Sequence, residues 1–571
     1  MRKKRWTVWF LIWVAALAAG LGALAYTHFK LERAGSPFGQ NPVLEEEISP
    51  FTEPMAQNVY LILIDGMRAD SLPDMPFVQS LADMGSSGVI VVEEPTFSRP
   101  AYARIITGAS SSISNIKTND QARKLNLPNL FDLARFSGLK TGGSLYYWFY
   151  ELVVGPPYRT GDSHENRFFH DEEMPLQSGY FYDDFNYQYN DREIFEYGIR
   201  IMRDYNPNFL VVHTMELDMA GHNYGGASPK YREILRMNDR QIQEFVQAIP
   251  DPENSVVIIT GDHGHIDAGG HGGPEKEASR VPLVIFGKGV KKGALPQYSQ
   301  LDLAPTIAAI LGMPFSRYMA GSIMEEAFDW TEAVLAEKRE LLKTTHAGFV
   351  QELYAQLGLE EAVDGEATVA AALDRVRAET IKRRVLVAVI LLLLLGGALV
   401  FGLGLHRRER RAKLFRGSRV MPAQALLSTA LYAAVFHLVF YGIGLGYSFS
   451  KLNTVAHLAV KMPLAVLASY LVLLALVLLL SRFKANFRIY ARHTGFIMVF
   501  LAALILGGAL LQGDKGFILP DYRYYMLTFF SSLHLALFAL FSLLGGGIML
   551  LLNRFKGKGA AEGEATPTPE D

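Results

Sequence analysis

The chain contains no cysteine, and this absence removes several kinds of chemistry. A protein without cysteine forms no disulfide, offers no thiolate to a metal ion and has no cysteine nucleophile. The formal net charge is only −2 over 571 residues, so the charge balance indicates neither a nucleic-acid-binding protein nor an acidic tail. We therefore predict no nucleic-acid binding, and the length predicts more than one domain.

Long apolar runs are present near both ends of the chain. Residues 1–26 begin with four basic side chains (RKKR) and continue as an apolar run that is long enough to cross a bilayer. We predict an uncleaved transmembrane anchor with its basic end in the cytoplasm, although Ala23–Ala25 (ALA) leaves a cleaved signal peptide open. Residues 27–57 are polar, contain several prolines and are interpreted as a linker.

Five further apolar segments predict an α-helical transmembrane bundle over residues 385–553. They are Val385–Leu405, Ala423–Leu445, Leu458–Leu480, Phe496–Leu511 and Met526–Leu552. The connecting segments alternate in basic content, which predicts six spans in all with both termini in the cytoplasm, residues 554–571 being a cytoplasmic tail. The same alternation places residues 27–384 outside the cytoplasm. The expected location is therefore the cell membrane, with multiple spans.

Residues 58–330 are predicted to form an α/β domain with a largely parallel central sheet flanked by helices. Short apolar runs alternate there with segments of helical spacing such as Tyr231–Gln247. The predicted strands are Asn58–Ile64, Gly88–Val92, Phe209–Thr214, Ser255–Thr260 and Val281–Phe286. Residues 331–384 are interpreted as an amphipathic helical connector between this domain and the membrane part.

Polar residues follow four of these strands and form a candidate site. They are Asp65 after the first strand, Thr96 and Ser98 after the second, Asp218 and His222 after the third, and Asp262, His263 and His271 after the fourth. Open α/β sheets bind ligands at the carboxyl ends of their strands, so we expect these side chains to converge. Carboxylate and imidazole groups suit zinc-like ions, and a polar glycine-rich turn is the alternative for Gly261–Gly273.

Four motifs, in this order along the chain, resemble the alkaline phosphatase superfamily. They are IDGMRAD (Ile64–Asp70), PTFSRPAYARIITG (Pro95–Gly108), DMAGH (Asp218–His222) and GDHGHIDAGGHGG (Gly261–Gly273). The resemblance is to the branch that holds type I phosphodiesterases/nucleotide pyrophosphatases and GPI ethanolamine-phosphate transferases. It covers roughly residues 58–290 and implies an alkaline-phosphatase-like catalytic domain; the membrane part is not covered.

The resemblance also implies two divalent metal ions that are bridged by a substrate phosphate. One ion would be held by Asp218, His222 and His271. The other would be held by Asp65, Asp262, His263 and the nucleophile. Zinc is the usual ion of the family, and manganese is the alternative. Two such ions would clamp the attacking and the leaving oxygen of an in-line displacement.

The nucleophile is expected to be Ser98, because it stands two residues before Pro100, as the nucleophile does in the family. A predicted helix over Ala101–Ile106 would place Ser98 at a helix N-terminus, where free N–H groups favour a phosphate. Thr96 is the alternative. Asn119 matches by spacing an asparagine that holds a phosphate oxygen in phosphodiesterase relatives, and Arg99 is expected to be an exposed arginine at the helix start.

These features predict a membrane-anchored, two-metal phosphodiesterase or phosphoethanolamine-type transferase. It would act through a covalent phosphoserine intermediate on a lipid- or glycan-linked phosphodiester, with a membrane lipid or lipid-linked glycan as its partner; the sequence does not identify protein partners. One alternative is a nucleotide pyrophosphatase-type hydrolase of soluble substrates, and another is a non-catalytic transporter or scaffold with a binding domain. A sulfatase is disfavoured, because the chain lacks cysteine and Tyr102 stands where a sulfatase has an arginine.

Overall fold

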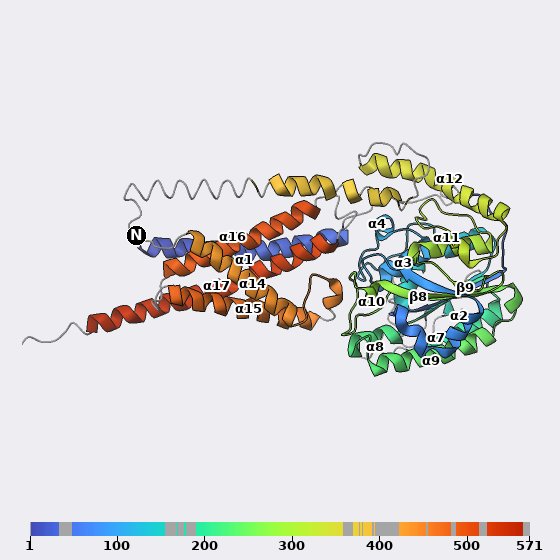
Figure 1. Cartoon of the computed structure of the whole chain (residues 1–571), viewed down its shortest axis with the longest axis horizontal. Helices are drawn as coiled ribbons and strands as arrows, with labels where there is room; N and C mark the ends of the chain where they lie inside the picture. Colours follow the sequence, from blue (N-terminus) through green and yellow to red (C-terminus); the bar gives the residue numbers. More distant parts are fainter. Residues whose placement is uncertain are drawn as a thin grey trace, which may run out of the picture. The chain divides into compact units, whose positions relative to one another are not determined.

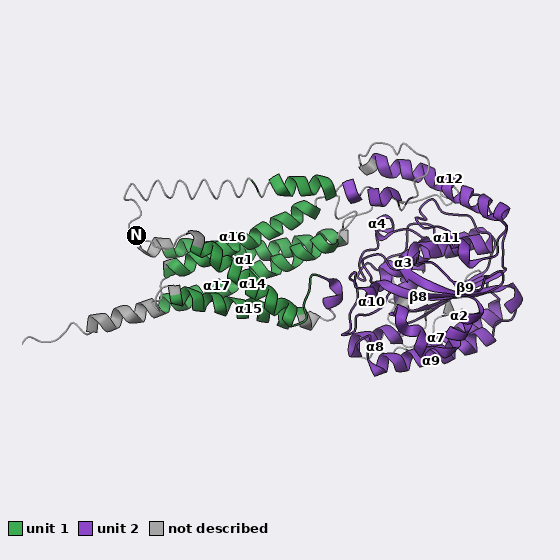
Figure 2. Cartoon of the chain, viewed as in Figure 1, with its two compact units in different colours: residues 1–33, 380–447, 454–571 green, residues 34–379, 448–453 purple. Residues whose placement is uncertain are grey.

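The computed structural model divides the chain into two compact units (Figures 1 and 2). The unit that contains the predicted catalytic domain, called the catalytic unit below, comprises residues 34–379 and 448–453; the unit that contains the predicted transmembrane segments, called the membrane unit, comprises residues 1–33, 380–447 and 454–571. The structure describes residues 2–33, 48–154, 168–169, 176–178, 190–357, 369, 371–375, 377–379, 381–390, 393, 422–452, 455–480, 487–512 and 522–562.

The catalytic unit is built on a ten-stranded sheet in the order β10-β2-β8-β7-β1-β6-β3-β5-β4, with β9 beside β2. The strands are β1 (Asn58–Ile64), β2 (Ser86–Val91), β3 (Thr141–Leu145), β4 (Phe168–Phe169), β5 (Leu176–Ser178), β6 (Phe209–Thr214), β7 (Ser255–Gly261), β8 (Arg280–Gly287), β9 (Gly293–Ala294) and β10 (Tyr298–Ser299). The central pairs β7-β1-β6-β3 are parallel, whereas β8 runs antiparallel to both β7 and β2. The predicted α/β domain with a largely parallel sheet is confirmed.

Helices cover both faces of this sheet (Figure 1). Those of the catalytic unit are α2 (Pro76–Met84), α3 (Ser98–Thr107), α4 (Ser111–Ser114), α5 (Leu130–Phe136), α6 (Tyr147–Val154), α7 (Asp191–Tyr205), α8 (Glu216–Tyr224), α9 (Pro229–Gln247), α10 (Lys276–Ser279), α11 (Leu303–Leu311) and α12 (Glu332–Leu357). Short 3₁₀ turns at Ala69–Asp74, Pro252–Asn254, Gln300–Asp302 and Glu325–Ala327 connect some of them.

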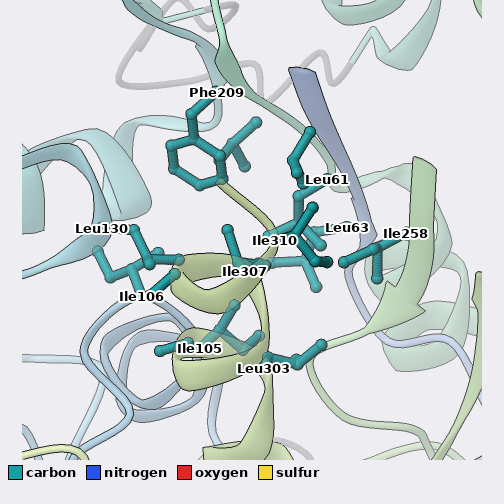
Figure 3. Close-up of a cluster of buried hydrophobic side chains, with 14 of the residues drawn as sticks. Leu61, Leu63, Ile105, Ile106, Leu130, Phe209, Ile258, Leu303, Ile307 and Ile310 are labelled. Atoms are coloured by element: carbon teal, nitrogen blue, oxygen red, sulfur yellow. The ribbon is translucent and has the colours of Figure 1, made fainter. Parts of the chain in front are cut away.

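Alternate residues of each central strand point into two separate hydrophobic cores, as the two-residue period of a strand requires. Leu61 and Leu63 of β1 lie in the core under α3, α5 and α11 (Figure 3). Tyr60 and Ile62 of the same strand lie in the core under α2, α7 and α9. Both faces of β1 are therefore buried, which explains why its sequence is a continuous apolar run.

The membrane unit consists of long apolar helices. They are α1 (Arg2–Arg33), α14 (Pro422–Gly442), α15 (Val455–Leu480), α16 (Phe487–Gln512) and α17 (Tyr522–Glu562). Each contains a stretch that is long and apolar enough to cross a membrane, so the described residues hold five candidate spans. The remaining predicted span, Val385–Leu405, lies largely outside the described residues. Two buried polar side chains pair within this unit: His534 Nε2 lies 2.6 Å from the Tyr432 hydroxyl.

Candidate metal and phosphate site

The register of three parallel strands brings the first site residues to one edge of the sheet. Ile64, the last residue of β1, is paired with Thr214 on β6 and with Gly261 on β7. The next residues on β1 and β7 are Asp65 and Asp262, and both emerge at the same level. Helix α8 follows β6 at this edge and carries Asp218 and His222. The convergence expected at the strand ends is therefore present.

Strand β2 delivers the nucleophile candidate to the same edge. Because β8 is antiparallel to both β2 and β7, the strand β2 runs in the direction of β7. The chain after β2 leads into α3, which begins at Ser98 and carries Pro100 in its first turn. Proline is favoured there because the first N–H groups of a helix have no partner within the helix. Ser98 thus lies at a helix N-terminus beside the strand ends.

Asp65, Ser98, Asp262 and His263 form what we call the nucleophile cluster. The Ser98 hydroxyl oxygen lies 3.0 Å from His263 Nε2. The same nitrogen lies 3.3 Å from Asp65 Oδ1 and 3.3 Å from Asp262 Oδ2. All four residues are fully buried. Two carboxylates, one imidazole and one hydroxyl therefore face a common point inside the protein.

Asp218, His222 and His271 form a second group, which we call the histidine cluster. The Nε2 atoms of His222 and His271 are 3.0 Å apart, and each lies 3.5 Å from Asp218 Oδ1. The two clusters are adjacent, because the rings of His263 and His271 stack at 3.7 Å between centroids. Unlike the nucleophile cluster, this group reaches solvent, since the His222 side chain is 29% exposed.

The imidazole tautomers indicate that both clusters are built for cations. His271 Nδ1 lies 2.8 Å from the Thr96 carbonyl, and His263 Nδ1 lies 3.1 Å from the Gly264 carbonyl. A carbonyl only accepts, so each Nδ1 carries a proton, and in the neutral form of each ring the lone pair of Nε2 is directed into its cluster. Hydrogen bonds that fix a tautomer in this way are typical of metal-binding histidines.

The buried carboxylates also indicate that the clusters are built for cations. Among the described residues, Asp65 Oδ1 and Asp262 Oδ2 are buried without a hydrogen-bond partner. Burial raises the pKa of Asp65 well above its ordinary value, and the neighbouring charge of Asp262 raises it further. Burying two such carboxylates side by side is costly unless a cation compensates them. Divalent ions therefore fit the residues that are present.

Three neighbouring residues hold the carboxylates in place and were not assigned from the sequence. His265 accepts the N–H of Gly270 at Nδ1, so its Nε2 is the donor to Asp218 Oδ1, 2.8 Å away. The ring of His265 therefore orients Asp218, and its Nε2 has no lone pair for a metal ion. The Tyr102 hydroxyl donates to Asp65 Oδ2, and His213 Nε2 lies 3.3 Å from the same oxygen.

Thr96 has a different role from Ser98 in the described geometry. Its hydroxyl donates to the Gly273 carbonyl at 3.0 Å and accepts the Gly272 N–H at 2.7 Å. Thr96 thus holds the glycine loop that carries His271, whereas the Ser98 hydroxyl faces the nucleophile cluster. This arrangement favours Ser98 over Thr96 as the attacking group.

Asn119 and Arg99 lie directly beside Ser98. The Asn119 side-chain oxygen accepts the Arg99 N–H at 3.0 Å, so the loop carrying Asn119 is attached to the start of α3. Arg99 is buried and forms an ion pair with Glu151, so the expectation of an exposed arginine was wrong. Arg99 can be buried because the carboxylate of Glu151, on α6, compensates the charge of its guanidinium group.

Comparison with known proteins identifies the class of this domain. The model of the type I phosphodiesterase / nucleotide pyrophosphatase family matches residues 59–272, which contain every residue of both clusters. The part of the chain that carries the site is therefore similar to type I phosphodiesterase / nucleotide pyrophosphatase domains.

The chain is a homologue of GPI ethanolamine phosphate transferases. It is 25% identical to GPI ethanolamine phosphate transferase 1 of Emericella nidulans over 354 residues, which are 52% of this chain and 38% of that protein. It is 24% identical to the human GPI ethanolamine phosphate transferase 2, catalytic subunit, over 318 residues, which are 52% of this chain and 30% of that protein. The chain thus spans less than two fifths of the length of these relatives.

Among solved structures, part of the chain matches murine ectonucleotide pyrophosphatase / phosphodiesterase 5, an inactive variant in complex with AMP. It is 13% identical to this chain, and the match covers 45% of this chain and 95% of that one with a TM-score of 0.36.

Proposed function

We propose that this protein is a membrane-embedded, metal-dependent transferase that moves a phosphoethanolamine-type group from a lipid-linked phosphodiester to a hydroxyl acceptor. The observation that carries the proposal is the position of the Ser98 hydroxyl, at the start of α3 and 3.0 Å from His263 Nε2, a nitrogen that also lies 3.3 Å from one oxygen each of Asp65 and Asp262. The similarity to GPI ethanolamine phosphate transferases supports the choice of transferred group.

We assign two divalent ions, zinc or manganese, to the two clusters as resident cofactors. Asp65, Asp262 and His263 form one group that could hold an ion, and Asp218 and His271 belong to a second such group together with His263 and His265. His222 lies 3.5 Å from Asp218 of this second group. The nucleophile cluster would hold one and the histidine cluster the other. When bound, the ions supply charge neutralisation for the phosphate and lower the pKa of the serine hydroxyl. The ligand chemistry supports this assignment, because carboxylate and neutral imidazole suit both ions.

The reaction follows from the positions of the protein groups. Ser98 Oγ attacks phosphorus and forms an Oγ–P bond while the bond from phosphorus to the lipid oxygen breaks. The proton that Ser98 loses balances the proton that the departing lipid alkoxide takes up. An acceptor hydroxyl then attacks the phosphoserine and loses its proton, which restores Ser98. The Ser98 N–H at the start of α3 and the Asn119 side-chain NH₂ are the donors that we assign to the phosphate oxygens, because the Arg99 N–H donates to Asn119, Pro100 has no N–H and the Ala101 N–H donates to the Phe97 carbonyl.

The membrane part supports a substrate that is lipid-linked. Five candidate spans exceed what an anchor requires, since a single span already inserts effectively irreversibly. Alternating basic content in the connecting segments supports an extracytoplasmic catalytic domain and cytoplasmic termini. We place the protein in the cell membrane on this basis.

The test is the mass of the covalent intermediate on the full chain in detergent. The chain is mixed with a phospholipid that carries an ethanolamine phosphate headgroup, quenched in acid and digested. We expect the Ser98 peptide to gain the mass of phosphoethanolamine, and Ser98→Ala to lose both the adduct and turnover while it keeps its metal. An adduct on Thr96 would overturn the nucleophile assignment. An adduct formed only from a soluble nucleotide substrate would favour a nucleotide pyrophosphatase instead.

A further inference from the structure

A short segment between two candidate spans belongs to the catalytic unit. Residues 448–453 connect α14 to α15 in the sequence, yet they form part of the same compact unit as the α/β domain (Figure 2). The segment contains a 3₁₀ turn at Phe449–Lys451, and the Ser448 hydroxyl accepts the Ser450 N–H at 3.2 Å. The described part of it, Ser448–Leu452, is called the inter-span segment below.

Two hydroxyl groups of this segment bind the loop that follows the metal ligand His271. The Gly273 N–H donates to the Ser450 hydroxyl oxygen at 3.0 Å, and both groups are buried. The Ser448 hydroxyl donates to the Glu275 carboxylate at 3.0 Å. The loop that carries the ligand is therefore attached to the inter-span segment on one side and, through Gly272 and Gly273, to Thr96 on the other.

An aromatic residue of the same segment contacts the residue that precedes the nucleophile. The ring of Phe449 packs edge-on against Phe97, with 5.1 Å between centroids, and Phe97 packs edge-on against His271 at 6.0 Å. Phe97 immediately precedes Ser98, and its carbonyl accepts the Ala101 N–H in the first turn of α3. Phe449 thus supports a residue that contacts one metal ligand and begins the helix of the nucleophile.

The close packing at this point requires glycine in the loop. Gly272 has a φ of +106°, and a Cβ there would lie 2.4 Å from Phe97 and 2.8 Å from Phe449. A Cβ on Gly273 would lie 1.9 Å from the Ser448 hydroxyl oxygen. A glycine at each position is therefore what allows the loop to pass between the inter-span segment and the nucleophile helix.

We propose that the inter-span segment is a positioning element of the catalytic centre. Through Ser450 and Phe449 it fixes the glycine loop, and so fixes His271 in the histidine cluster relative to Ser98. The catalytic centre is then incomplete without a part of the chain that lies between two candidate spans. This inference rests on the proposed metal sites, but its test does not depend on the transferred group.

The experiment measures zinc binding by the full chain in detergent. The metal-free protein is titrated with zinc against a competing fluorescent chelator, which resolves two binding equilibria in the wild type. Ser450→Ala should weaken one equilibrium about 10-fold and leave the other unchanged, because the Ser450 hydroxyl holds the loop that carries His271. Phe449→Ala should weaken the same equilibrium more than the other, since Phe449 also packs against Phe97, which precedes Ser98. Ser450→Thr keeps the hydroxyl and should restore wild-type binding.

Matched controls separate positioning from general damage. Phe51→Ala removes a ring that stacks on Phe136 at 5.8 Å, and Ser137→Ala removes a hydroxyl that donates to the Leu133 carbonyl. Both should keep two wild-type equilibria. The thermal midpoint is recorded for every variant, and Phe449→Leu replaces Phe449→Ala if the latter does not fold.

The inference is overturned if Ser450→Ala binds zinc like its control, or if both equilibria weaken equally. If the wild type forms no Ser98 adduct while Ser450→Ala still weakens one equilibrium, the proposed function fails and the positioning role stands. If the adduct forms and the two equilibria do not respond to either substitution, the positioning role alone fails.

Discussion

The nucleophile cluster and the histidine cluster contain the same kinds of ligand but differ in their access to solvent. Asp65, Asp262 and His263 have no exposed surface, whereas His222 on α8 is 29% exposed at its side chain. The ligands of the first cluster follow the central strands β1 and β7, which are buried on both faces. Those of the second lie on α8 and on a glycine loop at the periphery of the site.

This difference indicates a division of roles between the two clusters. A sealed cluster excludes water, which strengthens the electrostatic interactions of the charged groups around Ser98. Because the His222 side chain reaches solvent, we expect a substrate oxygen or an acceptor hydroxyl to approach from the side of the histidine cluster. We therefore expect substitutions in the nucleophile cluster to abolish the chemistry, and substitutions at His222 to reduce it by less.

The sharpest contrast is between Asp262→Asn and His222→Gln. Asp262→Asn removes a buried charge beside Ser98 and should lower kcat for a chromogenic phosphodiester by roughly 1,000-fold or more. His222→Gln keeps a polar ligand at the exposed position and should lower kcat by roughly 10- to 100-fold. Steady-state kinetics in excess zinc measure both. Equal losses in the two variants would mean that the clusters do not differ in role.

A smaller effect is expected from His265, which contacts the histidine cluster only through Asp218. His265→Gln removes the donor to Asp218 Oδ1 or changes its geometry. The affinity of the histidine cluster for zinc should fall about 10-fold, within the range usual for residues that orient metal ligands. Excess zinc should then restore most of kcat. A loss of kcat that zinc does not restore would indicate that His265 contacts the substrate.

The central strands and the main site residues could be predicted from the sequence because their signals are local. Strands β1, β6 and β7 are buried on both faces, so each appears in the sequence as an apolar run. Asp65 and Asp262 directly follow β1 and β7, and Asp218 comes shortly after β6. Strand β3 was not predicted, because TGGSL has little strand character. Gly142 in this strand is needed for packing, because a Cβ at this position would lie 2.7 Å from the Ile201 side chain.

The supporting contacts could not be predicted, because they join residues that are distant in sequence. Tyr102 meets Asp65 across 37 positions, His265 meets Asp218 across 47, and Gly273 meets Ser450 across 177. No pattern along the chain records such pairs. The one available signal was the H-x-H spacing of His263 and His265, which placed a second imidazole close to the site.

The most direct test of the central claim is the metal content of the full chain. Elemental analysis of the active protein should give close to two divalent ions per chain, and removal of both by a chelator should abolish activity until zinc or manganese is added back. Asp218→Asn should then retain close to one ion, because the nucleophile cluster is intact. A wild type with a single ion, or an Asp218→Asn variant that still holds two, would contradict the account of two adjacent metal clusters.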